Sequence, residues 1–347
     1  MSTRTLCLVA LAAATTGACT ADDQRWLAST ARDLSTDGMV TDFPLPTPRS
    51  GPTTLSIAAD GSIWFTLSGA NAIGRMNSDG SGYAEYAIPT PESSPRIIAV
   101  GADGNLWFSE HLGNKIGRVT PAGEIAEFPI PTPDSQPRAI ALSADGNIWF
   151  GEFKGGKIGR ITPAGAIREF AIPTPDSGPR ALAAGPDGNV WFSQFNASKI
   201  GRITPAGEIT EFTLPRPNSG PGDITAGADG NMWFVEISGA MDGRTPDGGR
   251  IGRITMDGEV TEFPMPPDGP SAINIAVGPD RNVWYTRGRL LGRVTPAGDI
   301  SEIPVAATEA RAVGLTAGSD RQPPERLTNR LWFTDPVGNR IAYLAFE

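Results

Sequence analysis

An internal repeat of about 42 residues limits how this chain can fold more than any other feature. Its clearest copy spans residues 137–175 and reads PRAIALSADGNIWFGEFKGGKIGRITPAGAIREFAIPTP. One tryptophan anchors each copy, and the anchors are Trp64, Trp107, Trp149, Trp191, Trp233, Trp284 and Trp332. Self-similarity at a fixed period of this size is typical of repeat architectures, so seven anchors predict seven structural units.

Each copy contains four short runs with strand composition, RAIAL, NIWFGE, KIGRIT and AIREFAI, separated by turn signals such as Asp-Gly, Gly-Gly and Pro-Ala-Gly. Four strands in a repeat of this length predict one blade of a β-propeller. We therefore expect an all-β fold over residues 39–347, a seven-bladed β-propeller with four antiparallel strands in each blade. The many glycines (42) and prolines (32) suit short strands joined by tight turns.

The order of the strand patterns also predicts how the ring closes. The fourth-strand pattern first occurs at residues 39–46, before the first anchoring tryptophan, and the last unit ends at IAYLAFE without a fourth strand. We expect the N-terminal strand to complete the last blade, which removes exposed sheet edges. Two units carry extra residues, at 237–249 and 319–330, and the sequence leaves open whether these insertions form a lid.

Residues 1–19, MSTRTLCLVALAAATTGAC, have the plan of a secretory signal peptide. The apolar run from Leu6 to Ala14 is too short to cross a bilayer as a helix. The segment Thr16-Gly17-Ala18-Cys19 resembles a bacterial lipobox, which predicts a lipid anchor on Cys19, with simple cleavage after Ala18 as the alternative. Residues 20–38 are polar and non-repetitive and read as a tether.

These features predict an extracytoplasmic protein, either a periplasmic or cell-envelope lipoprotein or a secreted one. Both cysteines, Cys7 and Cys19, lie in the leader, so the mature domain has no disulfide. The net charge is −9 and no basic run stands apart from matching acids, which argues against DNA or RNA as main partners. We expect a monomer that touches a membrane only through the anchor on Cys19.

Departures from the repeat indicate where a ligand binds. Arg96, Arg138, Arg180 and Arg311 follow or replace the proline that opens an inner strand, and Ser271 stands at another equivalent position. Inner strands line the axial channel, so these arginines predict a positively lined site for an anionic ligand. The alternative is that they pair with a ring of acids, since Glu110, Glu152 and Glu236 share one position in three units.

That ring of acids has two interpretations of its own. Carboxylates gathered around an axis could hold a hard cation, or each acid could pair with an arginine of the repeated Gly-Arg. The Gly-Arg arginines recur in six units, which favours a scaffold role. The repeated Asp-Gly-Asn (Asp103-Gly104-Asn105 and its copies) is interpreted as a tight hairpin turn rather than a calcium loop.

The motifs GxDGNxWF, NKIGRITPxG and xxEFxIPTPxSxP, repeated over residues 39–346, resemble those of the streptogramin B lyase (virginiamycin B lyase) family. The resemblance implies a seven-bladed propeller with magnesium on its axis. It also implies a histidine that, with the metal, opens a cyclic depsipeptide antibiotic at its ester by elimination, an activity that confers antibiotic resistance.

Carried over residue by residue, the resemblance implies Glu309 and Asp335 as magnesium ligands, with Arg311 where the family has its catalytic histidine. A second family histidine corresponds to Ser271. An arginine cannot serve as a general base near neutral pH, although Arg311 can stabilise an anion. The chain's one histidine, His111, lies in the second unit, and is read as a surface turn residue or as the one conventional base.

Two functions therefore remain open. The first, favoured by the missing histidines, is a binding or scaffold propeller that recognises a small molecule, peptide or glycan at its axial face. The second is a magnesium-dependent lyase that acts on a streptogramin B or a related ester, with Arg311 and His111 as catalytic residues.

Overall fold

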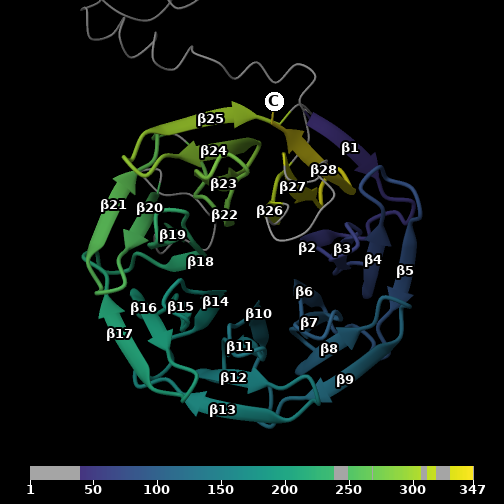
Figure 1. Cartoon of the computed structure of the whole chain (residues 1–347), viewed down its shortest axis with the longest axis horizontal. Helices are drawn as coiled ribbons and strands as arrows, with labels where there is room; N and C mark the ends of the chain where they lie inside the picture. The colour runs from purple at the N-terminus through teal and green to yellow at the C-terminus, as the bar shows by residue number, and fades with distance from the viewer. Residues whose placement is uncertain (1–39, 238–248, 268, 306–310, 318–328, 347) are drawn as a thin grey trace, which may run out of the picture. The chain divides into compact units, whose positions relative to one another are not determined.

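The computed structural model describes residues 40–237, 249–267, 269–305, 311–317 and 329–346. Seven four-stranded antiparallel sheets follow one another around a central axis in these residues (Figure 1). The expected all-β, seven-bladed propeller is thereby confirmed. Within the described ranges no helix has the length and apolar character needed to cross a membrane.

Each blade contributes one strand to each of four concentric positions. The innermost strands are β2 (Pro52–Ile57), β6 (Pro95–Val100), β10 (Pro137–Leu142), β14 (Pro179–Ala184), β18 (Pro221–Ala226), β22 (Ile275–Val277) and β26 (Leu315–Ala317). The second strands are β3 (Ile63–Leu67), β7 (Leu106–Glu110), β11 (Ile148–Glu152), β15 (Val190–Gln194), β19 (Met232–Glu236), β23 (Val283–Arg287) and β27 (Arg330–Asp335). The third strands are β4 (Ala72–Met76), β8 (Lys115–Val119), β12 (Lys157–Ile161), β16 (Lys199–Ile203), β20 (Arg250–Ile254), β24 (Leu290–Val294) and β28 (Arg340–Ala345). The outermost strands are β1 (Val40–Pro44), β5 (Ala84–Ala87), β9 (Ile125–Pro129), β13 (Ile167–Ala171), β17 (Ile209–Thr213), β21 (Val260–Pro264) and β25 (Ile300–Pro304).

The first and last strands of the chain close the ring. β1 pairs antiparallel with β28, with Val40 opposite Leu344 and Pro44 opposite Arg340 (Figure 1). Arg340 also forms an ion pair with Asp42 across this seam, at 3.1 Å between Nη1 and Oδ2. The prediction that the N-terminal strand completes the last blade is confirmed, and it covers the edge of β28 and gives the seventh sheet the same four strands as the others.

A repeated stack of three side chains holds the outer part of a blade. In the blade β6–β9, the rings of Trp107 and Phe128 stack at 5.5 Å between centroids. The Arg118 guanidinium lies 5.4 Å from each ring centroid, and its Nη1 donates to the Pro163 carbonyl of the next blade at 2.9 Å. The arginine of the repeated Gly-Arg thus fastens neighbouring blades, as expected of a scaffold residue.

The Asp-Gly-Asn segment forms the hairpin turn that its composition predicts. Asp103 Oδ1 accepts hydrogen bonds from the Asn105 amide at 3.1 Å and from Trp107 Nε1 at 3.2 Å. Gly104 adopts a φ of +76°, a left-handed conformation that glycine tolerates best. The carboxylate therefore ties the turn to the buried tryptophan.

The hydrophobic core lies between blades rather than inside them. Trp64 and Ile73 of one blade pack with Leu106, Phe108 and Val119 of the next. A blade therefore buries its apolar faces only by stacking on its neighbours. Residues 237–249 and 319–330, the two insertions, lie almost wholly outside the described residues.

Candidate axial ligand site

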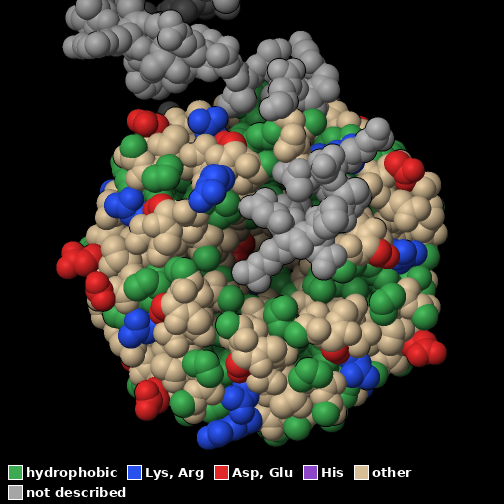
Figure 2. Space-filling model, in the orientation of Figure 1, with side chains coloured by type: hydrophobic (Ala, Val, Ile, Leu, Met, Phe, Trp, Pro, Cys, Tyr) green, Lys and Arg blue, Asp and Glu red, His purple; other side chains and the backbone are tan. Residues whose placement is uncertain are grey.

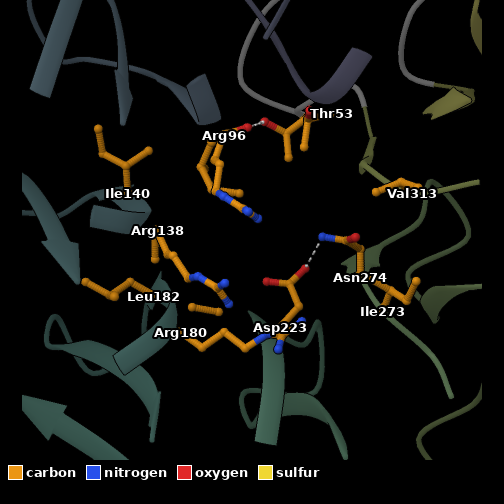
Figure 3. Close-up of a pocket in the computed structure, with 14 residues that line it drawn as sticks. Thr53, Arg96, Arg138, Ile140, Arg180, Leu182, Asp223, Ile273, Asn274 and Val313 are labelled. Atoms are coloured by element: carbon orange, nitrogen blue, oxygen red, sulfur yellow. Dashed lines mark hydrogen bonds between the residues drawn. The ribbon is translucent and has the colours of Figure 1, made fainter. Parts of the chain in front are cut away.

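A cavity of about 150 Å³ lies on the propeller axis, where the beginnings of the inner strands meet (Figure 3). Every blade contributes to its wall. The polar lining residues are Thr53, Thr54, Arg96, Arg138, Arg180, Asp223 and Asn274, and Ile273 and Val313 are among the apolar ones. Cations from three neighbouring blades therefore face a wall that contains one carboxylate, Asp223, among neutral and aliphatic side chains.

Each of the three arginines follows the proline that opens its inner strand. At Arg138 the pairing of β10 with β11 shifts register between Pro137 and Ala139, and β6 and β14 show the same irregularity. A shift of this kind takes a residue out of the regular ladder and re-aims its side chain. The Arg96 carbonyl accepts hydrogen bonds from Thr54 Oγ1 at 2.7 Å and Thr66 Oγ1 at 2.8 Å, which anchors this backbone to the preceding blade.

Aromatic rings hold two of the guanidinium groups in place. Arg138 lies over Phe153 at 4.3 Å, and Arg180 lies over Phe195 at 4.9 Å. Burial lowers the pKa of all three arginines, and repulsion from Arg96 and Arg180 contributes to lowering that of Arg138 to about 10. The buried Nε atoms of Arg96 and Arg138 have no hydrogen-bond partner within the described part of the chain. The site thus concentrates three positive charges, which the protein offsets only in part through Asp223.

One carboxylate faces these cations. Asp223 on β18 accepts hydrogen bonds through Oδ2 from Asn274 Nδ2 at 3.1 Å and from the Ile275 amide at 3.0 Å (Figure 3). Burial raises the pKa of Asp223, while these hydrogen bonds and the charge of Arg180 oppose the shift. Asp223 therefore links two blades and also presents a polar group to the cavity.

The structure brings three of the four predicted ligand-binding residues together. Arg96, Arg138 and Arg180 line one space, as expected. The equivalence assigned to Ser271 and Arg311 is wrong, because Ile275 pairs with Tyr285 and Leu315 with Phe333, which places Ile273 and Val313 at the arginine position.

Ser271 and Arg311 have other surroundings. The Ser271 side chain is buried and its hydroxyl donates to the Ile237 carbonyl at 3.2 Å. Arg311 is exposed, and its backbone amide donates to Asp335 Oδ1 at 3.0 Å. Neither residue lines the cavity.

His111 is buried, contrary to the interpretation of it as a surface turn residue. It occupies the turn position that Phe153 and Phe195 hold in the next two blades, which explains why its ring turns inward. Desolvation, with the nearby charges of Arg96 and Arg138, lowers the pKa of His111 to about 4. The imidazole is therefore neutral at physiological pH and is a weak proton acceptor.

Of the two proposed metal ligands, the structure describes one. Glu309 lies outside the described residues. Asp335 is fully buried, with Oδ2 accepting from Arg340 Nε at 2.9 Å and Oδ1 accepting from the amides of Arg311 and Gly338. Arg340 and the two amides thus occupy three of the acceptor positions of this carboxylate. No group of three acidic, histidine or cysteine side chains suited to a metal occurs among the described residues.

The acids at the ends of the second strands belong to charge networks inside single blades. Glu110 lies opposite Lys115, which forms an ion pair with Glu127 at 2.9 Å. The predicted pairing with the Gly-Arg arginines is wrong, because the antiparallel register places Arg118 opposite Trp107, at the other end of the strand. The alternative pairing of the axial arginines with these acids is likewise not formed in the described residues.

Positive charge is not a general property of the ring surface. On the face shown in Figure 2, Lys and Arg side chains lie toward the perimeter, interspersed with Asp and Glu.

Sequence reasoning missed Asp223 and Asn274. The signal was present, since both replace the small or apolar residue that follows the arginine in other blades, as in Arg138-Ala139 and Arg180-Ala181.

Comparisons with known proteins agree with this architecture. A model of the virginiamycin B lyase family matches residues 11–242 and 173–347. Virginiamycin B lyase from Staphylococcus aureus is 36% identical with a TM-score of 0.80, covering 89% of this chain and 99% of that one. A catalytically inactive histidine-to-alanine variant of that enzyme, in complex with quinupristin, is 35% identical with a TM-score of 0.79 and the same coverage. A streptogramin B lyase is 33% identical with a TM-score of 0.79, covering 89% and 97% of the two chains. No curated protein sequence matches the chain significantly.

Proposed function

The chain belongs to the virginiamycin B lyase family, and from this premise we propose that it is a binding propeller of the family, without the family's elimination chemistry. Its axial cavity holds a ligand from the class of small molecules, peptides or glycans. The observation that carries the proposal is the set of three guanidinium groups directed into the cavity. Such groups bind and orient a ligand but do not remove a proton from it.

The weak basicity of the chain's one histidine supports this proposal. Elimination beside a carbonyl needs a group that accepts a proton near neutral pH. The chain contains one histidine, His111, whose pKa is lowered to about 4. In the relative from Staphylococcus aureus, a single histidine-to-alanine change accompanies loss of catalysis. At the positions matched to the family's histidines, this chain has arginine and serine. It is therefore better suited to binding than to turnover.

An assay with quinupristin tests the proposal. The mature domain is incubated at high concentration with quinupristin and magnesium, with and without a chelator, and the products are separated and weighed by mass spectrometry. The substrate should remain intact. Elimination would open the ring at unchanged mass, and a chelator-sensitive product of that kind would overturn the proposal. A gain of one water would instead identify an esterase and would overturn it equally.

The second candidate is a magnesium-dependent lyase, favoured by the 36% identity to virginiamycin B lyase over 89% of the chain. In this candidate Glu309 and Asp335 would hold the metal, which would supply a Lewis acid. Arg311 stabilises the developing anion and His111 accepts the proton. Replacing Glu309 by glutamine should then abolish turnover, whereas the binding function requires Glu309 only if it touches the ligand.

We further propose that the protein works outside the cytoplasm as a monomer. Residues 1–19 direct export, and lipidation of Cys19 provides the membrane contact, with residues 20–38 as the tether. Mass spectrometry of the protein purified from membranes would show the lipid mass on Cys19. A Cys19→Ala variant should lose that mass and move to the soluble fraction.

A further inference from the structure

Building on the proposed function, we infer that the axial cavity binds a compact ligand carrying at least two oxyanion charges, that is, a phosphate ester or a polycarboxylate. Arg96, Arg138 and Arg180 bind the oxyanions, and Asp223 and Asn274 form hydrogen bonds with the ligand's neutral polar groups.

The charge of the cavity is the first argument. Arg96, Arg138 and Arg180 line the same 150 Å³ space and are close enough for their charges to repel one another. In the described part of the chain, no ion pair forms with these three groups, and the single nearby carboxylate, Asp223, acts on the charge of Arg180 alone, so one negative charge faces three positive ones. Holding like charges together in a partly buried space is unfavourable unless a counter-charge arrives. A ligand with two or more negative charges would supply that counter-charge.

The geometry of the arginines is the second argument. The guanidinium carbons of Arg138 and Arg180 lie over the rings of Phe153 and Phe195, at 4.3 and 4.9 Å from the ring centroids. A planar group fixed on one face keeps its N–H edges available, and those edges match carboxylate or phosphate oxygens in pairs. Figure 3 shows Arg96 and Arg138 directed into the central space and Arg180 extending toward Asp223. The arrangement is thus organised before a ligand arrives, which reduces the entropy lost on binding.

The size of the cavity and the residues opposite the arginines further limit which ligands fit. A cavity of about 150 Å³ accepts a body near the size of benzene. Across from the arginines, Ile273 and Val313 form an aliphatic wall, and the Asp223 carboxylate is the one acidic acceptor in the lining. A small carbon skeleton that bears oxyanions on one side and a hydroxyl near Asp223 fits this distribution.

Calorimetry on the mature domain, residues 20–347, tests the inference. The probes are citrate, inorganic pyrophosphate and acetate, the last as a monoanion of the same chemistry. Citrate or pyrophosphate should bind with one-to-one stoichiometry and weaken as salt increases, and acetate should bind far more weakly. A preference for citrate identifies a polycarboxylate site, and a preference for pyrophosphate identifies a phosphate site. The absence of saturable binding by both polyanions would overturn the inference.

Matched variants place the binding in the cavity. Arg138→Gln should weaken polyanion binding by at least about tenfold, and Arg96→Gln gives a second reading should the first variant fold poorly. Arg168→Gln is the control, because Arg168 also lies over a phenylalanine, Phe170 at 4.8 Å, but is exposed on the outermost strand β13. Equal affinities in Arg138→Gln and Arg168→Gln would refute the site.

Failure of the anion-binding test can be distinguished from failure of the proposed function. The quinupristin assay on the same preparation reports turnover independently of anion binding. Turnover would remove the proposed binding function whatever the anions do. Intact quinupristin with no polyanion binding would remove only the present inference.

Discussion

Replacing the buried Glu110 by glutamine should change how the stability of this propeller depends on pH. Glu110 is fully buried at the end of β7. Desolvation and the negative charge of Glu127 raise its pKa to about 8, and Lys115 only partly opposes the shift. In the unfolded chain the same carboxyl titrates near its ordinary value of 4.5.

The direction of the effect follows from where the proton is held. Because the folded protein binds this proton more tightly, the stabilisation is complete below pH 4.5 and is lost as the pH rises toward 8. Within that window one carboxyl contributes a slope of at most roughly 1.4 kcal/mol per pH unit, which falls off near pH 8, and about 3.5 kcal/mol in all between pH 5 and pH 8. The glutamine variant lacks this contribution and should lose less stability over the same interval.

The chain provides its own control. Gln194 occupies the equivalent buried position beside the Lys199–Glu211 ion pair, so glutamine fits this environment. Urea unfolding followed by tryptophan fluorescence at pH 5, 6, 7 and 8 gives the free energy of unfolding of each protein. Glu110→Gln should flatten the dependence on pH, and Gln194→Glu should steepen it. Identical slopes for the wild type and Glu110→Gln would refute the reasoning.

Three further outcomes are expected. Gly117→Ala should lower the free energy of unfolding by about 1–3 kcal/mol, because a Cβ at this position would lie 2.1 Å from Phe108 Cζ. Chemical denaturation measures the loss, and an unchanged midpoint would contradict the close packing of Phe108 on Gly117. Removing residues 1–47 deletes β1 and exposes the edge of β28, so the truncated protein should associate as its concentration rises. Light scattering measures this association, and a truncated protein that stays monomeric would argue against closure by β1. His111 should titrate near pH 4, since its pKa is lowered to about 4 by burial and two arginines; the imidazole ¹H resonance reports this directly, and Arg96→Gln should raise the midpoint.

The sequence predicted the propeller because the information for a blade is local. Strand composition, turn residues and the tryptophan anchor all lie within one repeat, and the displaced copy at residues 39–46 specified how the ring closes. The same reasoning placed Arg96, Arg138 and Arg180 at the axis, since each occupies the same position relative to its opening proline.

Only the tertiary structure decided what those positions contact. Strand register excluded Ser271 and Arg311 from the cavity. In the last two units the position that faces the cavity does not directly follow a proline, as it does in the units with an axial arginine, so the sequence pattern misplaced it. Register also placed Glu110 beside Lys115 rather than Arg118, since an antiparallel hairpin separates the two ends of a strand. The meeting of three arginines with Asp223 depends on ring curvature, which brings distant blades together. A single repeat determines a blade, but the chemistry at the axis arises from contacts between blades.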